Sequence, residues 1–216
     1  MNKKSRNART ILLDVAGQLF SKHGFSAVTT RMISDHAGVA PGNLYYYFKT
    51  KEAIFREVFW QMFDLEHALD YKKLLEKEPR VLDTADGQAY AIQRIVSDYF
   101  SRTVFYKEPW KRELIGKELF SRFPVMNLLD KDNPFQIEAE LRMELFFLIN
   151  PDGAPSEAHF WSNIPDTQGF FYLMSWPSIE KNYDANYIQE FQQRVINTTT
   201  MMMIKLLDLP IPEMLR

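Results

Sequence analysis

The segment Thr29–Phe55, TTRMISDHAGVAPGNLYYYFKTKEAIF, constrains the fold of this chain more than any other stretch. Its first part predicts a short helix that ends at Gly38, because a glycine readily takes the left-handed conformation that closes a helix. Its second part predicts another short helix, Gly42–Phe48, with Pro41 as a favourable first residue. Two short helices joined by a glycine turn are therefore expected in the N-terminal quarter of the chain.

Helical patterns flank this segment on both sides. Ala8–His23 carries apolar residues at helical spacing and precedes it. Thr29 and Thr30 are candidate caps for the first short helix, and Thr50 is suited to cap a further helix that follows. The apolar stripe of that further helix predicts that it continues to the Glu76–Glu78 region.

The remainder of the chain is divided by prolines into windows of helical length and pattern. No strictly alternating β-branched run occurs, and no turn dipeptide separates two strand-like segments. The sequence therefore predicts an all-α fold with a small N-terminal unit and a larger helical body. The helical windows of the body are 86–107, 110–122, 134–149, 156–175 and 184–208.

The composition is that of an ordinary globular protein and excludes several classes. Of the 216 residues, 46% are hydrophobic and 25% are charged, which is enough apolar material for a core. No apolar run approaches the roughly 18–20 residues that span a bilayer, so no membrane contact is expected. The absence of cysteine excludes disulfides and thiolate chemistry and is typical of a reducing compartment. The predicted location is the cytoplasm.

Charge is distributed unevenly between the two parts of the chain. Residues 1–56 carry nine Lys or Arg and three Asp or Glu, a net charge of +6. Residues 57–216 carry seventeen against twenty-five, a net charge of −8. A positive segment on an acidic body indicates a polyanion site at one end, although a basic tail that only aids solubility is the alternative.

The orientation of the second short helix favours DNA as that polyanion. At about 100° per residue, Leu44 and Phe48 share the face that packs inward. A glycine lets a nucleic-acid backbone approach closely, asparagine bonds a base edge or phosphate, and tyrosine offers a hydroxyl and a ring. The residues that project away from the core are Gly42, Asn43, Tyr45 and Tyr46, with Tyr47 on the flank. For Tyr46 and Tyr47 a packed aromatic cluster is the alternative.

Basic residues outside this helix extend the candidate DNA surface. Arg31, near the start of the first short helix, is placed to reach a guanine edge or a phosphate. Lys51 adds charge at a helix N-terminus, where backbone N–H groups already attract anions. The basic N-terminal residues either touch phosphate and the minor groove or form a disordered tail; they are Lys3, Lys4, Arg6 and Arg9.

Sixteen residues at fixed spacing resemble the helix-turn-helix of the tetracycline-repressor (TetR) family of bacterial regulators. They are Phe20, Gly24, Phe25, Thr29, Thr30, Ile33, Ala37, Gly38, Val39, Gly42, Leu44, Tyr45, Phe48, Lys51, Glu52 and Phe55. The resemblance covers roughly residues 8–56 and implies a DNA-binding domain over 1–56. It implies an effector-binding and dimerisation domain over 57–216.

The resemblance also assigns roles to individual positions. It implies that Arg31, Gly42, Asn43 and Tyr45 face bases, and that the residues facing phosphates are Thr30, Tyr46, Tyr47 and Lys51. Ala40 departs from the family, which often has Ser or Thr capping this helix. Losing that cap costs about 1 kcal/mol, partly offset by Pro41.

A single helix-turn-helix makes few contacts, so such proteins bind palindromic sites as two-fold dimers. The resemblance implies that the last two long helices form the dimer bundle, and intramolecular core is the alternative for each residue. The candidate interface residues are Phe170, Phe171, Met174, Phe191, Val195 and Met202.

The middle of the chain is unusually aromatic, and the resemblance implies a small-molecule pocket there. An aromatic lining suits an apolar or planar effector, with ordinary core packing as the alternative. The candidate pocket residues are Trp110, Phe147 and Trp161.

Motifs for catalysis are absent from the sequence. It has no Gly-rich phosphate loop, no nucleophile elbow and no paired histidines at metal-ligand spacing, so no catalytic residue, metal or cofactor is expected. The predicted function is a homodimeric repressor released from an operator by an unknown effector. The alternatives are an activator or protein-interaction module with weak DNA use, and an enzyme that uses the aromatic cavity.

Overall fold

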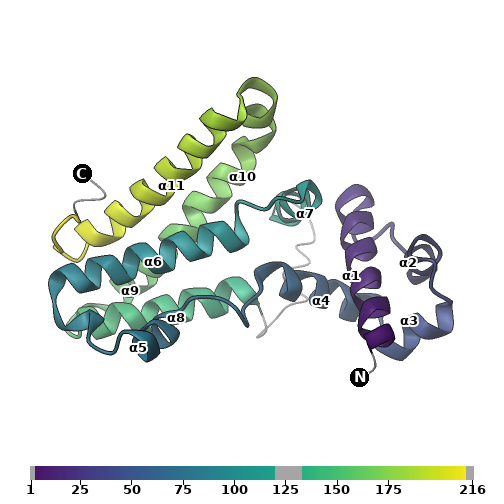
Figure 1. Cartoon of the computed structure of the whole chain (residues 1–216), viewed down its shortest axis with the longest axis horizontal. Helices are drawn as coiled ribbons and strands as arrows, with labels where there is room; N and C mark the ends of the chain where they lie inside the picture. The colour runs from purple at the N-terminus through teal and green to yellow at the C-terminus, as the bar shows by residue number, and fades with distance from the viewer. Residues whose placement is uncertain (1–2, 120–132, 213–216) are drawn as a thin grey trace. The chain divides into compact units, whose positions relative to one another are not determined.

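The computed structural model describes residues 3–119 and 133–212. All regular structure in these ranges is helical, which confirms the all-α prediction (Figure 1). None of these helices combines the length and hydropathy that crossing a membrane requires. The elements are α1 Lys3–His23, α2 Thr30–Ala37, α3 Pro41–Tyr47, α4 Lys51–Phe63, α5 Tyr71–Lys77, the 3₁₀ turn η1 Val81–Asp83, α6 Ala85–Thr103, α7 Pro109–Leu119, α8 Pro134–Ile149, α9 Pro155–Ser162, α10 Ile164–Asn182 and α11 Ala185–Lys205.

The chain forms two compact units, and each is built from two stretches of sequence. The head unit comprises Met1–Leu65 and Tyr106–Pro134, so that α7 belongs with α1 to α4. The body unit comprises Glu66–Phe105 and Phe135–Arg216. The predicted division at residue 56 concerns function and stays a prediction.

Capping residues define the short helices of the head unit. The Thr29 side chain accepts a hydrogen bond from the Met32 backbone N–H (3.1 Å), and the Thr50 side chain accepts one from Ala53 (3.1 Å). Gly38 ends α2 with φ +63°, in the left-handed region where a side chain would be strained. The predicted caps of α2 and α4 are therefore confirmed.

Aromatic packing holds the helices of the head unit together. The Phe55 ring of α4 lies edge-on to Phe20 of α1 and to Phe25 of the following turn, with 5.1 Å between ring centroids in both cases. Both Phe20 and Phe55 are fully buried. Edge-to-face pairs contribute beyond the area that they bury, so this cluster fixes α4 against α1.

Helix α7 packs closely on α1 because Gly17 leaves room for it. A Cβ at Gly17 would lie 2.3 Å from the ring of Trp110, a separation that real structures do not tolerate. One turn further on, the Ser21 hydroxyl donates to the Glu113 carboxylate (3.0 Å), and Lys117 donates to the Ser21 backbone carbonyl. The absence of a side chain at position 17 therefore allows α7 to pack against α1.

We expect Gly17→Ala to lower the free energy of unfolding by about 1–3 kcal/mol, since the new methyl group would overpack the Trp110 ring. Gly116→Ala is the matched control, because a Cβ there meets nothing within 4 Å. That control should stabilise α7 by up to about 1 kcal/mol through helix propensity. Denaturant unfolding of both variants checks the prediction, and equal stability of the two would contradict it.

Two sequence predictions about helix boundaries are wrong. The helix expected to continue to Glu76–Glu78 ends at Phe63, where Asp64 takes a left-handed conformation with φ +46°. A new helix, α5, then begins after Asp70, whose carboxylate accepts the Lys73 backbone N–H (2.9 Å). The apolar pattern continues past Phe63 in the sequence, but the chain turns at Asp64 and a new helix begins after the capping residue Asp70.

The window 156–175 likewise contains two helices in place of one. Helix α9 ends at Ser162, with Asn163 as its C-cap, and Pro165 occupies the first turn of α10, where its missing N–H costs nothing. Pro177, expected to end a helix, lies inside α10. The proline positions alone therefore did not determine the boundaries in this part of the chain.

Helix α6 is the centre of the body unit. It packs against α10 and α11, which run side by side, and against α5 and η1 (Figure 1). A Cβ at Gly169 of α10 would lie 2.9 Å from Val104, just beyond the end of α6. This close approach brings α10 near enough to α6 for buried polar side chains to meet between them.

Candidate nucleic-acid interface

Helices α2 and α3 form a helix-turn-helix that rests on α1. Two side chains anchor α3 from below: Leu44 is fully buried and Phe48 is 2% exposed. The Arg9 guanidinium lies 5.5 Å from the centre of the Phe48 ring and pairs with Glu57 of α4 (2.7 Å). The short helix is therefore clamped between α1 and α4.

The opposite side of α3 is open to solvent, as its helical geometry predicts. Gly42 and Asn43 are exposed, and the exposed fractions of Tyr45 and Tyr46 are 50% and 74%. Tyr47 is half-buried, with its ring edge-on to that of Tyr46 at 5.1 Å. Gly42, Asn43, Tyr45 and Tyr46, which are predicted to contact bases or phosphates, therefore share one accessible surface. Tyr47 packs beside this surface.

Two residues of α2 border this surface. The Thr30 hydroxyl and the Tyr45 phenol are 3.0 Å apart and share a hydrogen bond, which limits where the Tyr45 ring can point. The Arg31 side chain is 87% exposed and pairs loosely with Asp35 at 3.8 Å. A long, exposed ion pair of this kind contributes little stability, so the guanidinium is available to another anion.

Lys51 is more constrained than its sequence position indicated. Its ammonium group donates to the Phe25 backbone carbonyl (2.9 Å) and lies 4.3 Å from the centre of the Phe25 ring. An ammonium has three donors, so this arrangement holds the charge in place and leaves donors for a phosphate. The group is thereby fixed at the start of α4.

The N-terminus of α4 is electropositive. The pKa of the Glu52 carboxyl lies below its ordinary value because the backbone and the Thr50 side chain donate hydrogen bonds to it, with Lys51 and Arg56 adding positive charge. The same groups that stabilise this carboxylate favour any anion that approaches the helix end.

A cleft beside α3 contains basic residues that sequence reasoning missed. It has a volume of about 350 Å³, and Tyr47, Trp60, Lys49 and Arg56 are among its lining residues. Lys49 and Arg56 are both exposed. They were counted in the basic N-terminal segment, but only the fold puts them on the flank of the helix-turn-helix.

Helix α3 lacks a side-chain cap, as its alanine predicts. Ala40 occupies the N-cap position with φ −57° and ψ 138°, and no side chain bonds the first turn. Pro41 takes the first helical position. The free N–H groups at this end of α3 are therefore left to solvent or to a bound anion.

We expect Ala40→Ser to raise the free energy of unfolding by about 0.5–1 kcal/mol, because a serine hydroxyl would cap α3. Thr29→Ala is the matched opposite change, which removes an existing cap and should lower stability by about 1 kcal/mol. Thermal unfolding of both variants measures the two effects. A destabilised Ala40→Ser protein would show that the predicted cap does not form.

The three candidate effector residues do not share one described cavity. Trp110 lies in the head unit against Gly17, whereas Phe147 and Trp161 lie in the body unit. Trp161 lines a cavity of about 360 Å³ in the body. Phe147 is half-buried on α8, edge-on to Phe146 at 5.5 Å.

The candidate dimer residues lie on α10 and α11 with graded exposure. Phe171 and Met174 are 66% and 59% exposed, and Met202 is 38% exposed. The half-buried members are Phe170, Phe191 and Val195. Large apolar side chains exposed on adjacent helices are typical of a surface that another protein covers.

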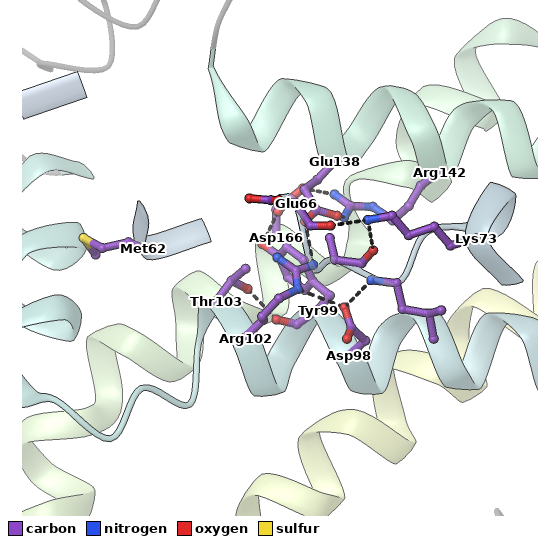
Figure 2. A network of polar contacts seen from close by, with 12 residues as sticks. Met62, Glu66, Lys73, Asp98, Tyr99, Arg102, Thr103, Glu138, Arg142 and Asp166 are labelled. Atoms are coloured by element: carbon purple, nitrogen blue, oxygen red, sulfur yellow. Dashed lines mark hydrogen bonds and ion pairs between the residues drawn. The ribbon is translucent and has the colours of Figure 1, made fainter. Parts of the chain in front are cut away.

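A buried network of charged groups joins α6, α8 and α10 in the body unit (Figure 2). Arg142 of α8 is 2% exposed; it donates to the Ser162 carbonyl (2.6 Å) and pairs with Asp166 of α10. The Tyr99 hydroxyl of α6 donates to the same Asp166 carboxylate. The Arg142 guanidinium also lies 4.9 Å from the centre of the Tyr99 ring.

The network continues toward solvent through Arg102 of α6. Its guanidinium bonds Asp98 on its own helix (2.9 Å) and Glu138 of α8 (2.7 Å). Asp98 in turn accepts the Leu69 backbone N–H (3.0 Å). The i, i+4 pair 98/102 is visible in the sequence, but the bond between α6 and α8 is not.

Burial is the largest influence on the pKa values of Asp166 and Tyr99 in this network. It raises the pKa of Asp166, and the Arg142 charge and the Tyr99 hydrogen bond oppose that rise. It also raises the pKa of Tyr99, and the Asp166 charge adds to that effect. The Asp166 carboxylate therefore depends on Arg142 to stay ionised in this interior.

We expect Arg142→Met to destabilise the protein by about 3–5 kcal/mol at neutral pH, because it leaves buried carboxylates without their cation. The pKa of Asp166 should rise further above its unfolded value. A raised carboxyl pKa favours the fold below the unfolded pKa, and that gain is lost as the pH rises through the folded pKa. The difference in the free energy of unfolding between the unmodified protein and Arg142→Met should therefore shrink as the pH falls.

Arg80→Met is the control for this prediction, since Arg80 is 90% exposed and pairs with Asp83 at the surface. No measurable change in stability is expected from it. Urea unfolding at a series of pH values, from about 7 down to about 4, near the ordinary carboxyl pKa values, gives both results. A deficit that grows on acidification would contradict the assignment.

This arrangement defines a protein with a helix-turn-helix, whose second helix has one face open to solvent, and with a helical body unit. Residues 12–58 match the family described as bacterial regulatory proteins, tetR family. The repressor KstR2 of Mycolicibacterium smegmatis is 31% identical over 104 residues, which are 48% of this chain and 50% of that protein. The regulator QacR of Staphylococcus aureus is 46% identical over 52 residues, 24% of this chain and 28% of QacR.

Solved structures resemble almost the whole chain. NalD, the secondary repressor of the MexAB-OprM multidrug efflux pump in Pseudomonas aeruginosa, has a TM-score of 0.58 at 19% identity and covers 94% of this chain and 96% of its own. FadR of Bacillus subtilis, solved in complex with stearoyl-CoA, has a TM-score of 0.59 at 15% identity, covering 90% of this chain and 97% of its own. At these identities the likeness shows the fold.

The match over residues 12–58 confirms the resemblance of the helix-turn-helix residues to the tetR family of bacterial regulatory proteins. The chain spans about half the length of the KstR2 proteins of Mycolicibacterium smegmatis and Mycobacterium tuberculosis, and about a quarter of KstR2 of Rhodococcus jostii and of QacR. The family match therefore lies in the head unit, which contains the helix-turn-helix.

Proposed function

We propose that this protein is a transcriptional repressor that binds a palindromic DNA operator as a homodimer and is released by a small-molecule effector. The observation that carries the proposal is the open face of α3, held by Leu44 and Phe48, in a helix-turn-helix of the tetR family. Such a protein acts on the chromosome, in agreement with the predicted cytoplasmic location.

The proposed base contacts are Arg31, Gly42, Asn43 and Tyr45. The exposure of Tyr45 and Arg31 supports this, as does the bond between Thr30 and Tyr45, which would orient the phenol before DNA arrives. Side chains that are ordered beforehand lose less entropy on binding. The proposed phosphate contacts are Thr30, Tyr46, Tyr47 and Lys51.

Dimerisation through α10 and α11 is part of the same proposal. Two half-sites one helical turn apart require two heads held by a two-fold axis. The exposed Phe171 and Met174 support this surface, and burial of each large apolar side chain stabilises an interface by about 1.5–3 kcal/mol. The remaining proposed interface residues are Phe170, Phe191, Val195 and Met202.

Release by an effector requires that the ligand bind one conformation of the dimer better than another. An aromatic contact at Trp161 is supported by its position on a cavity of the body unit. For Phe147 and Trp110 the support is their aromatic character alone. The stearoyl-CoA bound by FadR belongs to that protein, and the effector of this chain is an apolar or planar compound in our proposal.

We expect the purified protein to enrich a palindromic sequence from genomic DNA fragments, with two protomers on each site. Asn43→Ala should reduce discrimination at one base pair of each half-site by about 1–3 kcal/mol, because a base-edge contact is lost. Lys51→Met keeps the aliphatic stem over Phe25. It should weaken binding on all sequences and reduce the salt dependence by about one counterion per protomer.

The control is Lys77→Ala, an exposed lysine of α5 in the body unit, which should change neither binding nor salt dependence. Binding without preference for any palindrome would refute the repressor proposal. If gene regulation survives in a Tyr46→Ala, Lys51→Ala protein that no longer binds DNA, the alternative of an activator or interaction module replaces it.

A further inference from the structure

Two exposed tyrosines lie face to face where α10 is joined to α11, at a turn that can be followed in Figure 1. The rings of Tyr183 and Tyr187 are stacked, with 3.9 Å between their centroids and 11° between their planes. Neither ring belongs to the core, because the two residues are 47% and 42% exposed. The proposed DNA contacts and the proposed interface residues do not include this pair.

Backbone hydrogen bonds hold both tyrosines at the turn. The Tyr183 backbone N–H donates to the Ile179 carbonyl (3.1 Å) and completes the last turn of α10. The Tyr187 backbone N–H donates to the Asp184 carboxylate (2.9 Å), which caps the start of α11. The half-buried Phe191 ring lies nearly parallel to that of Tyr187, with 6.2 Å between centroids and 7° between planes. The helix ends and a third ring therefore keep the two phenols beside each other.

The stack brings matching edges of the two phenols together. At 3.9 Å and 11° the rings overlap almost fully, so that carbon atoms of one ring are in van der Waals contact with the other. Burial raises the pKa of the Tyr187 hydroxyl, and the charge of Tyr183 and a hydrogen bond with its hydroxyl raise it further. The two hydroxyls therefore lie at the same end of the stack, and the ring carbons next to them face each other.

We propose that Tyr183 and Tyr187 form an oxidation site, at which one-electron oxidants derived from hydroperoxides couple the two rings into a dityrosine within one chain. The full sequence contains no cysteine, so no thiol of this protein reduces the oxidant first. The product ties the end of α10 to the start of α11. The proposal concerns the body unit and does not rest on DNA recognition.

The reaction forms one carbon–carbon bond and removes two electrons. Each phenol gives one electron to the oxidant and releases its hydroxyl proton, which leaves unpaired spin on the oxygen and on the ortho ring carbons. The ortho carbons of the two radicals then join, and the hydrogen on each of these carbons moves through solvent to the oxygen of its own ring. The two electrons and two protons convert one hydrogen peroxide molecule into two water molecules. Because the rings are already in contact, coupling within the pair outpaces the encounter of radicals from different chains.

A second tyrosine pair in the same chain provides an internal comparison. The ring centroids of Tyr46 and Tyr47 are 5.1 Å apart, but their planes are nearly perpendicular, at 83°. An edge-on ring directs its rim at the face of its neighbour, so the ortho carbons of this pair do not lie side by side. Exposure alone would favour this pair, since Tyr46 is 74% exposed. The comparison therefore separates the effect of ring geometry from that of accessibility.

The test exposes the unmodified full-length protein to a haem peroxidase and hydrogen peroxide, and maps crosslinks by dityrosine fluorescence and peptide mass spectrometry. We expect a crosslink between Tyr183 and Tyr187 in a product with the mass of one chain less two hydrogens. Its yield should exceed that of any crosslink between Tyr46 and Tyr47 at least about fivefold. Absence of dityrosine, crosslinks only between chains, or an equal yield at the second pair would overturn the proposal.

Two variants then assign the crosslink to its residues. Tyr183→Phe and Tyr187→Phe each keep a stacked ring and remove only the hydroxyl that loses the electron and proton. Each should lower the dityrosine yield at least about tenfold. Both residues are exposed, so neither change removes core packing, and thermal unfolding verifies this.

The matched control is Tyr90→Phe, on α6, which removes the hydroxyl of a half-buried tyrosine that hydrogen-bonds Arg94. Its dityrosine yield should equal that of the unmodified protein. An unchanged yield in either Tyr183→Phe or Tyr187→Phe would overturn the assignment. Because the readout is a covalent crosslink, failure of the protein to bind an operator would leave this result standing.

Discussion

The burial of Leu44 and Phe48 is the interaction on which the proposed reading surface depends. Helix α3 has only seven residues, too few to be stable in water alone, and it lacks a side-chain cap. Its conformation therefore depends on the burial of these two side chains. A substitution that weakens the packing of Leu44 or Phe48 would displace Asn43, Tyr45 and Tyr46 together, because these three residues lie on the same short helix.

The body unit solves a different physical problem, which is to hold ionised groups in its interior. Arg142, Asp166 and Glu138 are each at most 5% exposed, and isolated charges at such depth would be prohibitively costly. Mutual pairing across α6, α8 and α10 makes the burial tolerable. A polar network has fewer acceptable arrangements than apolar packing, so it restricts how these three helices slide against each other.

The sequence predicted local features well and long-range ones poorly. Thr29, Thr50 and Pro41 mark helix starts through chemistry confined to a few neighbouring residues, and the structure agrees with them. The continuation of α4 past Phe63 was wrong because apolar periodicity gave no warning of the left-handed turn. The contact of Trp110 with Gly17 was not foreseen, since it joins residues 93 positions apart and no local signal marks it. The buried network was missed for the same reason.

The path of the chain through the two units has a consequence for how the protein is made. The chain leaves the head unit after Leu65 and returns to it at Tyr106, so α7 is synthesised after the first stretch of the body. Until α7 leaves the ribosome, the Gly17 side of α1 has no cover, although every residue of the helix-turn-helix already exists. The head unit therefore cannot complete its packing until the first stretch of the body has been synthesised. A fragment cut after α4 would keep that uncovered side permanently.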